Sequence, residues 1–201
     1  MLGLFWALYG ERPGAGDRIQ AFVEQTGIPQ PMLGILQALP NTQLWNRLKK
    51  EERLLEGIGV TEFGDQNTLM NFIPTRSLSE IAREYLESFW KLYDPARYLS
   101  RCLQQCLNIG IKDGRRQMMK LPLRKGIHLL LQLIWRQGIL HPEIRAQFWQ
   151  QLWTIWRRKP SLLNLYLGLC AAGEHFWEYR ELARARLTQQ LGYDPLLAGS
   201  S

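Results

Sequence analysis

The sequence predicts a mainly α-helical protein in which a short N-terminal βαβα segment precedes a bundle of several helices. Two observations carry this prediction. Residues 1–9 and 31–36 are short apolar runs, and each is followed by turn residues and a helical pattern, which is the order of a parallel unit. From residue 121 onward, apolar residues recur every three or four positions, as on one face of an amphipathic helix.

The N-terminal segment alternates strand and helix. A helix is expected from Asp17 to about residue 25, and Gly27 should end it. The turn Pro40-Asn41-Thr42 then leads into a helix that contains Trp45. Two parallel strands cannot cover both faces of their own sheet, so this segment needs neighbours.

Two amphipathic helices follow in the middle of the chain. Ser77 and Glu80 have the spacing of a capping box, which predicts a helix start. Asp94 is expected to cap a second helix with Pro95 in its first turn, where a missing N–H group costs nothing. Two amphipathic faces that meet at this corner require a third surface to cover them.

The last part of the chain is predicted to be all helical. Helices are expected at about 121–137, 142–158 and 160–191, and an interruption of the third at Gly173 is left open. Breaks between them are indicated by Gly138, His141-Pro142 and Lys159-Pro160. The expected division of the chain is a partial-barrel fragment at 1–60, a linker with two amphipathic helices at 61–112, and a helical domain at 113–201.

The charge is uneven along the chain. The net charge is +7 over 201 residues, and 46% of the residues are hydrophobic, so the chain can bury a core. Residues 1–100 carry 10 Lys and Arg against 12 Asp and Glu, whereas residues 101–201 carry 15 against 6. The basic half suits nucleic acid, anionic lipid or an acidic protein surface. No stretch resembles a membrane span or a secretory leader, which predicts a cytoplasmic protein.

Several sequence words resemble one family over nearly the whole chain. The family is that of cobalamin-binding radical-SAM proteins, and the similarity is to the end of their barrel and to their helical C-terminal domain of unknown function. The matching words are GERPGAGDRI (10–19), LQALPNTQLWNRL (36–48), NFIPTR (71–76), FWKLYDPARYLSR (89–101), AQFWQQLW (146–153) and GEHFWEYR (173–180). The resemblance places Pro40, Asn41 and Thr42 near the mouth of the barrel, with Asn41 where many relatives have Gly.

The resemblance also implies cofactors for a complete enzyme: an iron–sulfur cluster, S-adenosylmethionine and cobalamin. The family binds its cluster with three cysteines in the pattern CxxxCxxC. Cys102 and Cys106 fit the first spacing, but the third position is Ile109. Both thiols lie on the apolar face of a predicted helix and are interpreted as small buried side chains. For this chain alone we therefore expect no catalytic residue, no metal ligand and no cofactor.

Two aromatic stretches allow more than one interpretation. Residues 148–159, FWQQLWTIWRRK, suit a helix at a membrane interface, but packing of the tryptophans in the core is favoured. In GEHFWEYR, His175, Tyr179 and Arg180 invite an acid–base interpretation, but a polar seam between helices is favoured. The basic connector at 112–125 is interpreted as solvated rather than as a nucleic-acid site.

Two hypotheses of function remain open. The first is the C-terminal portion of a cobalamin-dependent radical-SAM-type enzyme, not catalytic alone, whose partner is the missing N-terminal half or another copy of the chain. The alternative is a free-standing basic helical module that binds an acidic protein, RNA or a membrane surface. Nucleic acid and membrane are the less favoured partners.

Overall fold

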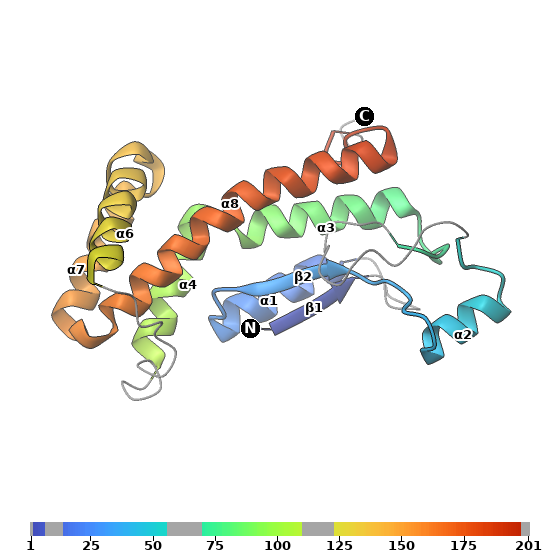
Figure 1. Cartoon of the computed structure of the whole chain (residues 1–201), viewed down its shortest axis with the longest axis horizontal. Coiled ribbons are helices and arrows are strands. Elements are labelled where there is room, and N and C mark those ends of the chain that lie inside the picture. The colour runs from blue at the N-terminus through green and yellow to red at the C-terminus, as the bar shows by residue number, and fades with distance from the viewer. Residues whose placement is uncertain (1, 7–13, 56–69, 110–122, 198–201) are drawn as a thin grey trace. The chain divides into compact units, whose positions relative to one another are not determined.

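A computed structural model of the chain describes residues 2–6, 14–55, 70–109 and 123–197, and these residues are mainly helical, as predicted (Figure 1). They form two compact units. Unit 1 contains residues 1–21, 30–90 and 180–201, and unit 2 contains residues 22–29 and 91–179. The expected domain boundaries near residues 60 and 112 lie outside the described residues, so the three-part division stays a prediction.

Unit 1 contains the predicted βαβα segment. Strands β1 (Leu2–Trp6) and β2 (Pro31–Ile35) pair in parallel, with Leu2 opposite Pro31. They are joined by α1 (Ala15–Thr26), and α2 (Gln43–Lys50) follows β2. Helix α1 ends at Gly27, whose φ of +65° is the left-handed conformation that favours glycine at a helix end. The strand order is confirmed, whereas its membership of a barrel stays a prediction.

Helix α3 (Leu78–Leu92) covers the sheet in unit 1. Its apolar face buries Ile81, Tyr85, Leu86 and Phe89. The hydroxyl group of Tyr85 donates to the carbonyl oxygen of Leu33 in β2 at 3.4 Å. The helix begins one residue after Ser77, as the sequence predicts, and the carbonyl oxygen of Ser77 accepts the N–H group of Ile81.

The predicted Asp-Pro corner is present. Helix α4 (Pro95–Asn108) begins after Asp94, whose Oδ1 accepts the backbone N–H group of Arg97 at 3.0 Å. The proline at the first position of the helix needs no partner for an N–H group. The periodic apolar residues of α4 then face inward in unit 2, and the fully buried ones are Tyr98, Leu99, Cys102 and Cys106.

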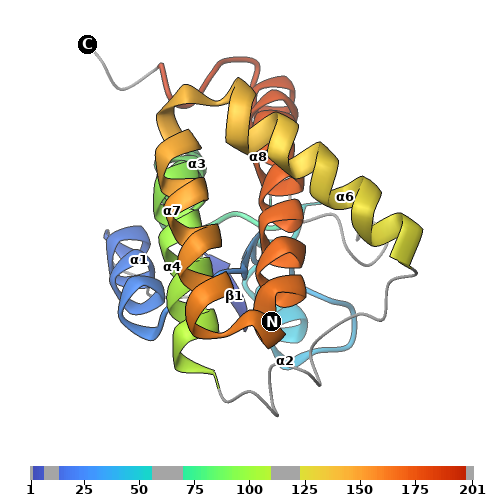
Figure 2. The same cartoon turned by 90° about the vertical axis from the view of Figure 1, so that its left-hand side faces the viewer.

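The C-terminal helices begin and end close to the predicted positions. They are α6 (Leu123–Trp135), a π-helical turn η1 (Arg136–Leu140), α7 (Pro142–Arg158), a 3-10 turn η2 (Pro160–Leu162) and α8 (Leu163–Leu191). Figure 2 shows α6 and α7 meeting at η1 and diverging from it. Helix α8 continues through Gly173, because this glycine lies against the ring of Tyr98 rather than at a break.

Candidate functional site

The residues that the sequence places near the barrel mouth form the turn between β2 and α2. Pro40, Asn41 and Thr42 are all exposed. Asn41 adopts φ +65°, a left-handed conformation that asparagine tolerates better than most residues. Thr42 caps α2, because its Oγ1 accepts the N–H group of Trp45 at 3.2 Å and donates to the carbonyl oxygen of Leu39 at 2.7 Å.

Asn71 fixes the base of this turn. Its side chain is buried, its Nδ2 donates to the carbonyl oxygen of Ala38, and its Oδ1 accepts the N–H group of Ala38, each at 2.9 Å. These two bonds satisfy the N–H group and the carbonyl oxygen of Ala38, which lies beyond the end of β2. Ala38 and Asn71 are 33 residues apart in the sequence, so this contact joins the segments LQALPNT and NFIPTR.

Glu84 on α3 makes a second tie in unit 1. Its Oε1 accepts the N–H group of Gly16, in the first turn of α1, at 3.0 Å, and its Oε2 lies 2.9 Å from Nη1 of Arg76. Burial would raise the pKa of Glu84, but the hydrogen bonds from Gly16 and Arg76 and the charge of Arg76 lower it below its usual value. The carboxylate thus joins the words GERPGAGDRI and NFIPTR.

These ties define one edge of the sheet, which we call the strand-end edge: the first turn of α1 at residues 14–18 and the turn at residues 38–42. One follows β1 and the other follows β2. Because the carboxyl ends of parallel strands share an edge, this is where ligands bind in open α/β sheets. The turn offers a ring, an amide and a hydroxyl group, of which the hydroxyl group of Thr42 is already bonded to Leu39 and Trp45.

The cysteines do not fit an iron–sulfur cluster. Cys102, Cys106 and Cys170 are all free and buried in unit 2. Burial raises the pKa of each thiol, and that of Cys106 reaches about 11. Ile109 stands at the third position of the cluster pattern, so the two cysteines of α4 do not supply its three ligands. Within the described ranges, no three His, Cys, Asp or Glu side chains are placed to hold a metal ion. The interpretation of Cys102 and Cys106 as buried side chains is confirmed.

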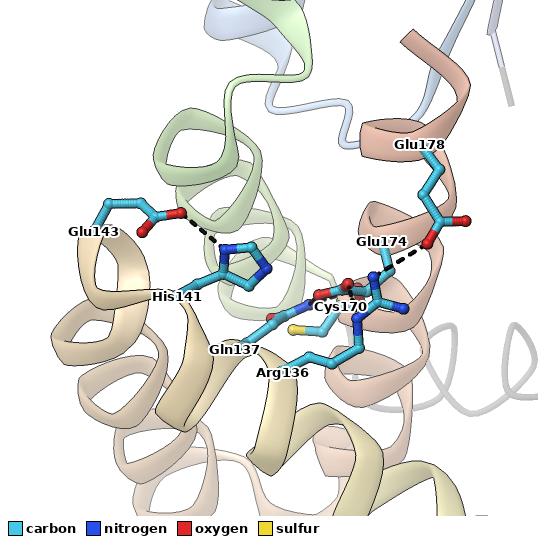
Figure 3. A network of polar contacts seen from close by, with 7 residues as sticks. All are labelled: Arg136, Gln137, His141, Glu143, Cys170, Glu174 and Glu178. Carbon is cyan, nitrogen blue, oxygen red and sulfur yellow. Dashed lines mark hydrogen bonds and ion pairs between the residues drawn. The ribbon is translucent and has the colours of Figure 1, made fainter. Parts of the chain in front are cut away.

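A buried polar cluster joins η1 to α8 in unit 2 (Figure 3). Nε2 of Gln137, which is fully buried, donates to the carbonyl oxygen of Cys170 at 3.0 Å and to Oε1 of Glu174 at 2.9 Å. Arg136 places Nε 2.7 Å from Oε2 of Glu174 and Nη2 3.1 Å from Oε1 of Glu178. One buried amide and two ion pairs therefore hold the π-turn on α8.

The π-turn is closed by the N–H group of His141, which donates to the carbonyl oxygen of Arg136 at 3.1 Å. Nδ1 of His141 lies 2.9 Å from Oε1 of Glu143, and the ring meets that of Trp177 edge-on at 5.9 Å. The pKa of Glu143 is lowered by its own backbone N–H group and by His141. Isolated π-turns are frequent at functional sites. In the described residues, the contacts of this π-turn hold the turn itself in place.

Gln137 and Glu174 were not predicted from the sequence, in which His175, Tyr179 and Arg180 were the candidate residues. The available signal was a Gln and a Glu inside strongly apolar helical patterns, which require partners when buried. The expected polar seam of His175, Tyr179 and Arg180 between helices is not formed by their ring contacts, since one lies within α8 and the other is a cation–π contact. The rings of His175 and Tyr179 are 5.9 Å apart, whereas the guanidinium group of Arg180 lies over the ring of Trp90 at 5.3 Å.

The expectation that the tryptophans of α7 pack in the core is wrong. Phe148 and Ile155 are fully buried, but Trp149, Trp153 and Trp156 are 42%, 58% and 55% exposed. Helix α7 has two apolar stripes, and only the stripe with Phe148 and Ile155 is buried in the core. In the described part of the chain, no helix combines the length and the apolar character needed to cross a membrane.

Comparisons with known proteins support the resemblance. The model of a family described as a domain of unknown function (DUF4070) matches residues 42–189. An uncharacterized methyltransferase, sll1242, from Synechocystis sp. (strain ATCC 27184 / PCC 6803 / Kazusa) is 46% identical over 95% of this chain and 35% of its own length. A hopanoid C-2 methylase from Rhodopseudomonas palustris (strain TIE-1) is 26% identical over 74% of this chain and 27% of its own length.

The chain therefore spans about a third of the length of these curated relatives. No solved structure matches it. The predicted resemblance to the C-terminal region of cobalamin-binding radical-SAM proteins, with its domain of unknown function, is confirmed, and the matching relatives are named a methyltransferase and a methylase.

Proposed function

We propose, since the chain belongs to the family of the domain of unknown function DUF4070, that it is the C-terminal portion of a cobalamin-dependent radical-SAM-type methyltransferase. The relatives that it matches are named a methyltransferase and a methylase, and it spans a minor part of each. The iron–sulfur cluster would be held by the rest of such an enzyme, because the cysteines of this chain are buried and do not form the family's pattern of three. S-adenosylmethionine and cobalamin would be held there too, as the family resemblance implies.

One observation carries the proposal. Three sequence words of the family converge on the strand-end edge, through the amide of Asn71 and the carboxylate of Glu84. This edge lies at the carboxyl ends of both strands, which is where the active sites of α/β folds are built. The chain would supply the last parallel strands of the barrel and would position the turn at Pro40, Asn41 and Thr42 near the substrate.

The proposed partner is the N-terminal part of the enzyme, and the proposed compartment is the cytoplasm. The test is to co-express the 201-residue chain with the part of the Synechocystis methyltransferase that it does not match. We expect the two polypeptides to co-purify and the reconstituted pair to consume S-adenosylmethionine, whereas neither does so alone. A folded chain that neither co-purifies nor restores consumption contradicts the proposal.

Matched variants at Asn41 test the role of the turn. Asn41→Gly keeps the left-handed backbone and should retain consumption of S-adenosylmethionine by the pair. Asn41→Val places a β-branched residue at positive φ, which is strained, and should reduce that rate without separating the polypeptides. Equal rates for the two variants would show that the turn lies away from the reaction.

A further inference from the structure

The largest concentration of exposed apolar side chains in the described residues lies on α6, η1 and α7 of unit 2. On α7 it consists of Trp149, Trp153 and Trp156, which we call the tryptophan face. On α6 and η1 it consists of a ridge of large side chains, each about half exposed: Ile127, Leu131, Trp135, Ile139 and Leu140. Large exposed apolar side chains gathered on neighbouring elements in this way indicate an interaction site.

The two parts of this surface are physically joined. Nε1 of Trp149 donates to the carbonyl oxygen of Gly138 in η1 at 3.1 Å, and the indole ring packs against this glycine, where an added Cβ would lie 3.1 Å from the ring. The rings of Trp153 and Trp156 contact each other, with centroids 5.0 Å apart. Since α7 diverges from α6 at η1 (Figure 2), the tryptophan face and the ridge flank the same turn.

The exposed charges on α7 are mostly positive, whereas Arg136 in η1 is paired with Glu174 and Glu178 of α8. On α7, Arg145, Arg157 and Arg158 are exposed, and the acidic residue Glu143 is engaged by His141. A basic surface beside exposed apolar side chains suits a bilayer that contains anionic lipid, because such a bilayer presents negative charge next to an apolar interior.

The side-chain chemistry also selects among anionic partners. Tryptophan is enriched at membrane–water interfaces because its ring is apolar and its N–H group is polar. Nucleic acid is bound through bases that stack on ring faces, and the contact between Trp153 and Trp156, whose centroids lie 5.0 Å apart, occupies part of these faces. The aliphatic side chains of Ile127, Leu131 and Ile139 can contact acyl chains, but they have no hydrogen-bonding or charged group to bind a sugar-phosphate backbone.

We propose that the exposed surface of α6, η1 and α7 docks on the surface of an anionic lipid bilayer, with Trp153 and Trp156 entering the interface and Arg157 pairing with lipid phosphate groups. The helix would lie in the plane of the membrane, as amphipathic interfacial helices do. This proposal is independent of the methyltransferase assignment, since it rests on exposure and charge in unit 2 alone.

The test uses the complete 201-residue chain and sedimentation with vesicles. One set contains phosphatidylglycerol and phosphatidylcholine in equal amounts, and the other contains phosphatidylcholine only. We expect binding to the first set at low salt, with a blue shift of tryptophan emission and quenching by brominated lipid. The double variant Trp153→Ser with Trp156→Ser should weaken binding roughly tenfold or more.

Control variants test whether binding depends on the tryptophan face and its arginines, or on exposed apolar side chains and positive charge in general. Ile73→Ser with Leu182→Ser removes two comparably exposed apolar side chains outside unit 2 and should leave binding unchanged. Arg157→Ser with Arg158→Ser should weaken binding to anionic vesicles roughly tenfold, whereas the same charge change at Lys49 and Lys50, exposed on α2, should have little effect. Unfolding midpoints of all variants establish that the chain remains folded.

Three outcomes overturn the proposal. The first is a folded chain that binds neither set of vesicles. The second is binding that the tryptophan variant does not weaken, which would indicate charge attraction alone. The third is a dimer, or a complex with nucleic acid, that the tryptophan variant dissociates while vesicle binding is absent, which would assign the face to that partner.

Discussion

Gly173 and Gly168 lie on the same helix but have different surroundings. A Cβ added at Gly173 would lie 2.6 Å from Cε1 of Tyr98, whose hydroxyl group is fixed by the carbonyl oxygen of Leu169 at 2.7 Å. A Cβ added at Gly168 would have nothing within 4 Å. Glycine is therefore required at one position and only tolerated at the other.

The prediction is that Gly173→Ala lowers the free energy of unfolding by about 1–3 kcal/mol, because the new methyl group displaces a packed ring. Gly168→Ala should instead raise it by up to about 1 kcal/mol through helix propensity. Urea unfolding of both variants measures the difference. Equal effects would mean that the Tyr98 ring moves aside without cost.

The same residue scale shows why the cysteines were predictable and Gly173 was not. Cys102 and Cys106 repeat with the apolar residues of α4, so periodicity alone places them inside. Gly173 carries no such signal. Its role depends on Tyr98, a residue 75 positions earlier that packs on α8, and the local sequence around a glycine does not distinguish a close approach from a break.

At the scale of elements, Glu84 ties α3 to the first turn of α1 and to Arg76. Its pKa in the folded chain lies below the usual value, so the ionised carboxylate favours the folded state. This stabilisation is complete above the pKa of glutamate in the unfolded chain. It is lost as the pH falls from that value through the lower pKa of the folded chain.

We therefore expect Glu84→Gln to lower the urea midpoint at neutral pH and to converge with the unmodified chain in acid. Glu87→Gln on the same helix is the control, because Glu87 is exposed and lies 3.9 Å from Arg83, a contact that contributes up to about 0.5 kcal/mol. The readout is the unfolding midpoint of both variants across pH. A constant difference at every pH would show that the charge of Glu84 is not the cause.

The polar cluster at η1 gives a second prediction for the elements. Glu174→Leu removes the acceptor of the buried Gln137 amide and the partner of Arg136, and should cost about 1–3 kcal/mol of unfolding free energy. Glu178→Leu removes only an exposed ion pair and should cost less than about 1 kcal/mol. Chemical unfolding of both variants measures this. Equal costs would contradict a structural role for Gln137.

Element boundaries were largely predictable from local chemistry, and the faces of α7 were not. Asp94 and Pro95 specify a helix start by themselves. On α7, however, Phe148 and Ile155 form one stripe, while Trp149, Trp153 and Trp156 form another at the same helical spacing. Periodicity identifies both stripes as apolar, and only the tertiary partners decide which is buried. The π-turn is equally dependent on partners, since Gly138 lies under Trp149.

At the scale of the whole molecule, the described residues have two surfaces that a neighbour could cover: the exposed tryptophan face and the free edges of the two-stranded sheet, whose strand β2 is largely buried. In these residues β1 and β2 pair only with each other, and a two-stranded sheet is marginal without further strands. The sequence predicted this segment and its need for neighbours, because parallel strands are covered on both faces. It did not predict the tryptophan face, since sequence alone does not reveal which apolar residues remain uncovered.

The last prediction separates these two surfaces. A dye that fluoresces on exposed apolar surface should bind the purified 201-residue chain. If the tryptophan face is the main site, Trp153→Ser with Trp156→Ser should remove most of the signal, and anionic vesicles should compete with the dye. If the open sheet is the main site, the signal should persist in that variant and fall when the N-terminal part of the related methyltransferase is co-expressed. Absence of dye binding by the folded chain contradicts both, because it would mean that the chain covers these surfaces itself.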